Sequence, residues 1–208
     1  MGAIIYTQAL FVVADGAYLR GIAVLLAFAR TLLNRRRFVT LRMGWIEILC
    51  SFEPLLLLLV TYYLQAHAGP PASFGLGQLC ATVLGAALVL AGWGLVIWSF
   101  LSWPSIFAGH GVLAEHELMT RGAYGFVRHP VYLGAFLIWA GLTVGFRSPA
   151  AFLVTALYVI PVYLLYIRSE EEMMVDSFGD AYRDYRRTVP MLIPALRQAW
   201  GNPVPHAG

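Results

Sequence analysis

Long apolar runs separated by short polar stretches dominate the chain. Three of them, at about 3–29, 43–66 and 78–103, are each long enough to cross a bilayer as a helix. Two more, 130–146 and 150–168, are joined by the short linker FRSPA, so we expect them to form an antiparallel hairpin. The pattern therefore predicts an all-α integral membrane protein, built as a bundle of about five transmembrane helices.

A few charged residues interrupt the first two runs. Asp15 and Arg20 lie in the first, which we still expect to form one spanning helix with its polar side chains facing protein. Glu47 and Glu53 lie in the second, where Pro54 predicts a kink. A charged side chain at the bilayer centre costs about 3 kcal/mol on insertion scales. We therefore expect the acids either to be paired or functional, or to lie near the ends of their helices.

The polarity of the chain changes after the third run and divides it in two. Residues 1–103 supply three N-terminal transmembrane helices, whereas 104–208 contain a polar loop at 104–128, the hairpin 130–168 and a tail. In the tail, apolar side chains recur at helical spacing between charged ones, at Phe178, Tyr182, Tyr185 and Val189. This periodicity predicts a C-terminal amphipathic helix at the membrane surface, with its tyrosines in the aromatic belt of the interface.

Composition and charge support a membrane protein and suggest its orientation. The chain is 60% hydrophobic and 12% charged, with a mean hydropathy of +0.71, which is far from the usual soluble mixture. Its net charge of +3 does not indicate a nucleic-acid partner. All fourteen basic residues are arginines, and all but Arg20 and Arg147 fall in 30–42, 104–128 or the tail from 168. The positive-inside rule places these stretches in the cytoplasm and the N-terminus on the opposite side.

Titratable and aromatic side chains gather where the polar loop meets the fourth run. In the sequence RHPVY, Arg128 and His129 directly precede Pro130, a residue that fits the first turn of a helix. Tyr132 lies three positions after His129, so the two share a helix face. Because the hairpin is antiparallel, the start of its first helix must lie beside the end of its second, where Glu170 stands.

Aromatic side chains on the second helix of the hairpin lead to the same carboxylate. Tyr163, Tyr166 and Glu170 are spaced at i, i+3 and i+7, so they lie along one helix face. Aromatic rings and a carboxylate both attract a cation, such as a sulfonium or an ammonium group. The chain has no HExxH, CxxC or paired-histidine spacing, so we expect no metal site.

Several ordered motifs in the second half resemble a known family. HELMTRGAYGFVRHPVYLG, a following EE pair, FGDAYRDYRRTVP and LIP occur in this order within residues 110–194. Together they are similar to the isoprenylcysteine carboxyl methyltransferases, whose relatives include the membrane phospholipid methyltransferases. The resemblance implies S-adenosylmethionine as methyl donor, bound near the cytosolic surface, and a lipophilic or amphipathic acceptor that enters from the bilayer.

Carried over position by position, the resemblance also assigns site residues. Those expected to bind the cofactor are His116, Leu118, Met119, Tyr124, Arg128, His129, Tyr132, Gly134, Glu170 and Glu171. Those expected to take part in catalysis are His129, Tyr166, Arg168 and Glu170. The cytosolic loop, the hairpin and the amphipathic helix would thus form the cofactor site together, on the cytoplasmic face of the membrane.

One position departs from the family pattern. Isoprenylcysteine methyltransferases carry an arginine about one turn before their glutamate pair, where this chain has Tyr166, and the nearest arginine is Arg168. If that arginine holds the acceptor carboxylate, N-methylation of a phospholipid headgroup of the phosphatidylethanolamine type is the alternative to carboxyl methylation. A third hypothesis, from another class, is a non-catalytic membrane transporter or assembly protein that retains the fold.

Overall fold

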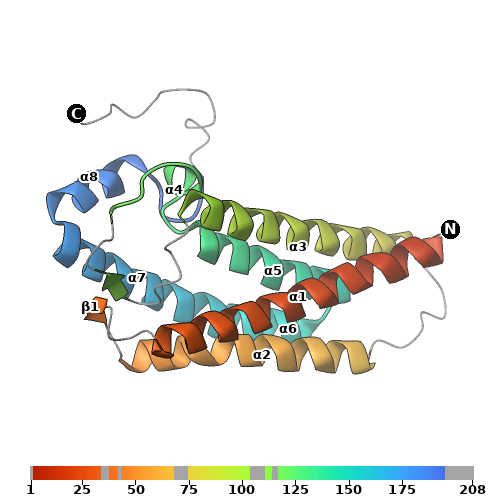
Figure 1. The fold of residues 1–208 in the computed structure, drawn as a ribbon. Helices are drawn as coiled ribbons and strands as arrows, with labels where there is room; N and C mark the ends of the chain where they lie inside the picture. The colour runs from red at the N-terminus through yellow and green to blue at the C-terminus, as the bar shows by residue number, and fades with distance from the viewer. Residues whose placement is uncertain are drawn as a thin grey trace.

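Long helices packed side by side make up most of the protein (Figure 1). The computed structural model describes residues 2–33, 38–41, 44–67, 75–103, 111–113 and 117–194. Within these ranges the bundle contains α1 (Gly2–Leu33), α2 (Trp45–His67), α3 (Leu76–Ser102), α5 (Pro130–Phe146) and α7 (Ile160–Phe178). The first apolar run is a single helix, as predicted, and α2 continues through Pro54.

The helix that ends in α7 is longer than α7 itself. It begins with α6 (Pro149–Val154), passes through the π turn η3 (Thr155–Val159) and continues as α7. A proline lacks the N–H of a regular helix and its ring crowds the preceding turn. The π turn stands directly before Pro161 and accommodates it by changing the hydrogen-bonding pattern locally.

Within the part of the chain that the structure describes, four helical stretches are long and apolar enough to cross a membrane. They are Ile4–Leu26, Trp45–His67, Leu76–Ser102 and Pro149–Phe178. The fifth helix of the predicted bundle, α5, is equally apolar but has only 17 residues. It is joined to α6 by a tight turn, in which Arg147 adopts a left-handed conformation (φ 51°) and the Ser148 hydroxyl accepts a hydrogen bond from the backbone N–H of Ala151 at 3.1 Å. The hairpin predicted from the FRSPA linker is therefore present.

Helices α3 and α5 approach each other through their glycines. A Cβ atom built on Gly92 would lie 2.6 Å from the backbone oxygen of Gly134, and one on Gly85 would lie 2.6 Å from that of Gly141. No side chain larger than hydrogen fits at such distances, so the two backbones are in direct contact, as in small-residue packing of membrane helices. This contact places the start of α5 beside the end of α3.

The charged residues of the apolar runs have different surroundings. Arg20 of α1 and Glu53 of α2 are buried and form an ion pair, with Nη1 and Oε1 separated by 2.6 Å. Glu47 lies in the first turn of α2 and accepts a hydrogen bond from the backbone N–H of Gly44 at 2.6 Å. Asp15 is exposed on the side of α1. The expectation of pairing is thus met by Glu53, while Glu47 stabilises a helix start.

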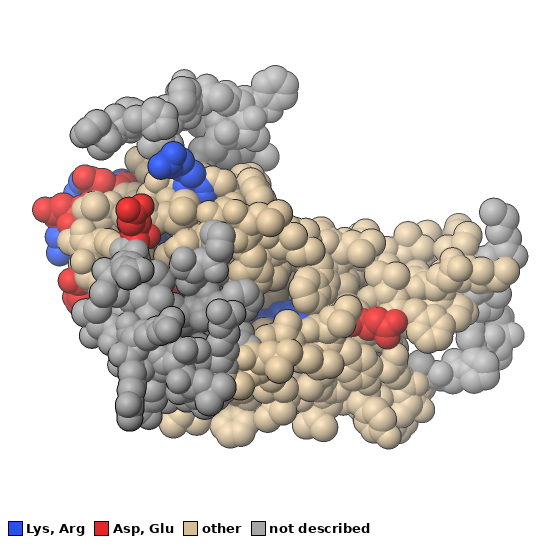
Figure 2. Space-filling model, in the orientation of Figure 1, with Lys and Arg blue, Asp and Glu red and all other residues tan. Residues whose placement is uncertain are grey.

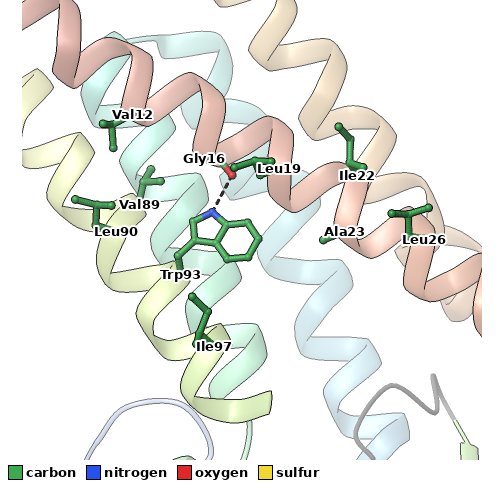
Figure 3. A pocket seen from close by; sticks show the side chains of 10 residues that line it. All are labelled: Val12, Gly16, Leu19, Ile22, Ala23, Leu26, Val89, Leu90, Trp93 and Ile97. Carbon is green, nitrogen blue, oxygen red and sulfur yellow. Dashed lines mark hydrogen bonds between the residues drawn. The ribbon is translucent and has the colours of Figure 1, made fainter. Parts of the chain in front are cut away.

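An apolar groove runs along the outside of the bundle between α1 and α3 (Figure 3). Its volume is about 620 Å³, and apolar side chains such as Leu19, Ile22 and Ile97 line it. The indole N–H of Trp93 in its wall donates to the backbone oxygen of Gly16 at 2.9 Å. The wall therefore suits the hydrocarbon interior of a membrane.

Charged side chains gather at the end of the bundle opposite the N-terminus (Figures 1 and 2). This end, called the α8 end below, carries α4 (Ala123–Phe126) and the charged helix α8 (Asp180–Thr188). It also carries a small antiparallel ribbon, in which β1 (Phe38–Leu41) pairs with β2 (Gly111–Leu113). The all-α prediction did not include this ribbon, because strands of four and three residues are too short to show an alternating pattern.

Candidate active site

Backbone hydrogen bonds hold the start of α5 against the last described residues of the chain. The N–H of Arg128 donates to the oxygen of Pro190 at 2.8 Å, and the N–H of His129 donates to that of Met191 at 3.2 Å. The Arg128 guanidinium also donates to the backbone oxygen of Val189. The RHPVY sequence and the segment after α8 therefore form one unit, although they are about sixty residues apart in sequence.

Glu171 of α7 is the centre of a buried ion-pair cluster. Its Oε1 atom lies 2.7 Å from Nη2 of Arg128 and 3.2 Å from Nε2 of His129. Its Oε2 atom lies 3.5 Å from Nε of Arg186 on α8. A carboxylate with three cationic or donor partners is fully engaged within the protein. Glu171 thus ties α7 to the start of α5 and to α8.

The neighbouring Glu170 has a different environment. Its Oε2 atom accepts a hydrogen bond from the Tyr132 hydroxyl at 2.9 Å and lies 3.9 Å from Nδ1 of His129. The side chain is 28% exposed, whereas that of Glu171 is 8% exposed. His129 therefore stands between the two carboxylates, and Glu170 is the one that faces open space. The structure brings the imidazole of α5 and the carboxylates of α7 together, as the hairpin predicted.

Aromatic rings form the opposite wall. Trp103 packs edge-on against Tyr124, with ring centroids 5.5 Å apart, and the Tyr185 hydroxyl donates to the backbone oxygen of Tyr124 at 2.6 Å. Burial raises the pKa of the Tyr124, Tyr182 and Tyr185 phenols, so all three remain neutral. Tyr182 and Tyr185 were expected in the aromatic belt, and this expectation is wrong. Both are buried, because α8 folds back against α4 and α7.

The Tyr124 hydroxyl is the unusual polar group of this wall. Tyr124 is 5% exposed, yet its hydroxyl has no hydrogen-bond partner among the described residues. A buried polar atom without a partner costs about 1–3 kcal/mol, so such atoms commonly mark a place where a ligand or water belongs.

A small cavity of about 50 Å³ separates the two walls. Its lining includes seven residues expected from the sequence: Leu118, Met119, Tyr124, Arg128, His129, Tyr132 and Glu170. The sequence analysis did not assign six other lining residues to the site: Trp103, Pro130, Val131, Met174, Tyr182 and Tyr185. For Met174, Tyr182 and Tyr185 the only signal was helical spacing on α7 and α8, which equally fits a membrane-facing stripe.

The other expected site residues lie away from the cavity lining. Gly134 faces α3, where a Cβ atom would lie 2.7 Å from the backbone oxygen of Gly92. Arg168 is exposed, and Glu171 is engaged in its ion pairs. The ring of Tyr166 packs against that of Tyr132, with centroids 5.9 Å apart, and only Tyr132 of the two lines the cavity. His116 lies outside the described residues.

The chemistry of the cavity suits an organic cation with polar edges. It offers one carboxylate, several aromatic faces and a phenol without a partner. Sites for small molecules usually measure about 300–1,000 Å³, so a ligand larger than a few atoms must move side chains to enter. Among the described residues, no group of three His, Cys, Asp or Glu side chains could hold a metal ion.

Comparisons with known proteins point to one enzyme family. Residues 80–181 match the family described as phospholipid methyltransferase. The protein-S-isoprenylcysteine O-methyltransferase of Schizosaccharomyces pombe is 39% identical over 83 residues, which cover 39% of this chain and 35% of that protein. Methanethiol S-methyltransferase 1 of Bradyrhizobium diazoefficiens is 34% identical over 126 residues, which cover 50% of this chain and 42% of that protein.

The matches are partial in length. The protein-S-isoprenylcysteine O-methyltransferase of Mus musculus is 34% identical over 82 residues, which cover 39% of this chain and 29% of that protein. The chain thus spans less than half the length of these curated relatives. No solved structure matches it. The matched family segment contains most of α3, all of α5 and α7, and most of the cavity lining.

Proposed function

We propose that the protein transfers a methyl group from S-adenosylmethionine to a lipophilic or amphipathic acceptor, because residues 80–181 match the phospholipid methyltransferase family. The observation that carries this proposal is the cavity at the α8 end, where the Glu170 carboxylate and the partnerless Tyr124 hydroxyl face the same space. The catalytic half is then 104–208, to which Trp103, the residue directly after α3, is added.

The described residues fit the proposed donor. Glu170 would hold its positive charge, and the aromatic wall would hold its adenine ring by stacking. Tyr124 would donate its hydroxyl to a polar edge of the ligand. When bound, S-adenosylmethionine supplies a methyl group on a positively charged sulfur, and the transfer disperses that charge. The task of the side chains is therefore to position two partners and exclude water, which accounts for about 7–11 kcal/mol in favourable cases.

The charges around the cavity bear on the acceptor. Tyr166 stands where the resemblance implied an arginine for a carboxylate acceptor, and Arg168 is exposed. Arg128, the arginine that lines the cavity within the described ranges, is already paired with Glu171. These observations favour an amine or thiol acceptor over a carboxylate. Such an acceptor must lose a proton, and Glu170 and His129 are the groups that could accept it.

The proposed site faces the cytoplasm. Twelve of the fourteen arginines lie in 30–42, 104–128 or the tail from 168, and the ribbon joins the first two of these stretches at the α8 end. The positive-inside rule then puts the cavity in the cytoplasm and the N-terminus outside.

Labelled donor tests the proposed function directly. Membranes that contain the protein are incubated with methyl-labelled S-adenosylmethionine and supplied in turn with a prenylcysteine, phosphatidylethanolamine or a small thiol. We expect transfer to at least one acceptor. Base-labile volatile label indicates an ester, label retained in a lipid headgroup indicates an amine, and a labelled thioether indicates a thiol. If all three acceptors remain unlabelled and the purified protein does not bind the donor, the proposal is wrong.

The Tyr124 hydroxyl provides a second test. Tyr124→Phe removes a hydroxyl that has no partner among the described residues, so we expect no loss of thermal stability without ligand. We expect S-adenosylhomocysteine to bind about 2- to 10-fold more weakly by calorimetry, the usual contribution of one hydrogen bond. Tyr185→Phe is the matched control, because it removes a formed bond to Tyr124 and should lower stability. Equal affinity of Tyr124→Phe and wild type would show that this hydroxyl does not meet the donor.

A further inference from the structure

A buried polar network lies in the membrane-spanning part of the bundle. The Arg20 Nη1 atom donates to both carboxylate oxygens of Glu53, at 2.6 and 2.9 Å, and Nη2 donates to the Tyr163 hydroxyl at 2.5 Å. The indole N–H of Trp139 donates to Oε1 of Glu53 at 2.5 Å. The four side chains come from α1, α2, α5 and α7, and none is more than 6% exposed. Charges at this depth are costly, so a role beyond helix association is to be sought.

The network is connected to the candidate site through two tyrosine rings. The ring of Tyr163 packs edge-on against that of Tyr132, with centroids 5.5 Å apart. It packs in the same way against Phe136, also at 5.5 Å. Tyr132 lines the cavity, and its hydroxyl donates to Glu170 at 2.9 Å. The orientation of the Tyr163 ring therefore limits the rotamers that Tyr132 can adopt.

We propose that the Arg20–Glu53 ion pair positions the donor site by fixing the ring of Tyr163. Tyr163 then holds Tyr132 in the rotamer from which its hydroxyl reaches Glu170. Arg20 and Glu53 do not line the cavity, so they are positioning residues. Because Glu170 is the proposed partner of the donor's positive charge, this inference rests on the proposed function.

The forked geometry of arginine is needed for this role. Arg20 directs one nitrogen to Glu53 and the other to Tyr163, and the planar guanidinium keeps these directions fixed relative to each other. Lysine has one nitrogen on a flexible chain and cannot reproduce both contacts with the same geometry. Simple association of α1 with α2 would require the contact to Glu53 alone. The contact to Tyr163 is the one that reaches the site.

Tyr163→Phe tests the inference because it keeps the ring and removes the hydroxyl that Arg20 contacts. The matched control is Tyr158→Phe, which removes another inter-helix bond, from the Tyr158 hydroxyl to the backbone oxygen of Leu49 at 2.6 Å. The first readout is the ¹⁹F resonance of 3-fluorotyrosine placed at position 132, in protein without ligand. We expect Tyr163→Phe to shift or broaden this resonance and Tyr158→Phe to leave it unchanged.

The second readout is the affinity for S-adenosylmethionine. We expect Tyr163→Phe to weaken binding about 3- to 10-fold and Tyr158→Phe to have no effect. In a Tyr132→Phe background, Tyr163→Phe should add no further loss, because the effect passes through Tyr132. Arg20→Lys should reproduce most of the loss.

The outcomes separate the inference from the proposed function. An unchanged ¹⁹F resonance in Tyr163→Phe overturns the inference, as do independent losses in the double variant. If the wild-type protein does not bind the donor, the proposed function fails. The ¹⁹F comparison of Tyr163→Phe with Tyr158→Phe then still decides whether the ion pair positions Tyr132.

Discussion

Glu170→Gln should weaken the binding of S-adenosylmethionine about 10- to 100-fold and reduce methyl transfer at least as much. The substitution keeps the size of the side chain and an oxygen that can accept the Tyr132 bond, but it removes the negative charge that faces the cavity. Hydrogen bonds and contacts to a charged group contribute about 1.5–3 kcal/mol, which corresponds to this range. Titration calorimetry with the purified variant measures the change.

The next acidic residue along α7 is the control for this prediction. Glu172 is exposed and is not among the residues that line the cavity. Glu172→Gln removes the same charge from the same helix and should bind the donor as wild type does. The two ligands add a further check, because S-adenosylhomocysteine lacks the positive sulfur. If Glu170 faces that sulfur, Glu170→Gln should weaken the binding of S-adenosylhomocysteine less than that of S-adenosylmethionine. Equal losses of affinity for both ligands would show that the carboxylate contacts another part of the ligand.

Gly92→Ala should lower the stability of the whole bundle by about 1–3 kcal/mol, the usual cost of overpacking. The added methyl group would lie 2.6 Å from the backbone oxygen of Gly134, and a backbone atom cannot turn away as a side chain can. The clash therefore pushes α3 and α5 apart. We expect a melting temperature several degrees below that of wild type, measured in detergent by unfolding fluorescence.

Gly94→Ala is the matched control on the same helix. A Cβ atom at Gly94 meets nothing within 4 Å, and alanine favours a helix more than glycine does. This variant should be as stable as wild type or slightly more so. A melting temperature for Gly92→Ala equal to that of Gly94→Ala would mean that the two helices do not touch through Gly92.

The sequence predicted the bundle and the main juxtaposition of the site. Apolar length alone defined the five helices, and the short FRSPA linker forced the start of α5 next to the end of α7. His129 therefore lies within 3.2 Å of Glu171 and 3.9 Å of Glu170, as expected from the hairpin. These features could be predicted because they depend on local periodicity and connection length, both of which are written directly in the sequence.

The different environments of the two glutamate side chains could not be predicted from the sequence. Glu170 and Glu171 are adjacent in sequence, but a helix turns by about 100° per residue, so they point in different directions. One faces Tyr132 and the cavity, and the other faces Arg128. Which of them is ion-paired depends on the segment after α8, whose backbone hydrogen bonds to Arg128 leave no trace in the sequence pattern.

α8 was expected to help form the cofactor site, and Tyr182 and Tyr185 line the cavity. The error for this helix was to place these two tyrosines in the aromatic belt of the membrane interface, because both are buried. The alternation of tyrosines with charged residues in α8 fits a helix that lies flat on a membrane, and the same alternation fits a helix that closes over a cavity. The difference is decided by tertiary contacts, here the bond from Tyr185 to the backbone of Tyr124. Gly134 shows the same limit, since a glycine in a site motif and a glycine in a helix contact look alike in sequence.

The central claim is that one donor molecule lies in the cavity at the α8 end, between Glu170 and the aromatic wall that contains Tyr124. The most direct measurement is an experimental structure of the purified protein at saturating S-adenosylhomocysteine. The account predicts ligand density at the α8 end, in a widened cavity, with contacts to Tyr124 and Glu170 from opposite sides. Ligand density elsewhere in the bundle, or an ordered cavity at the α8 end that stays closed at saturation, would contradict it.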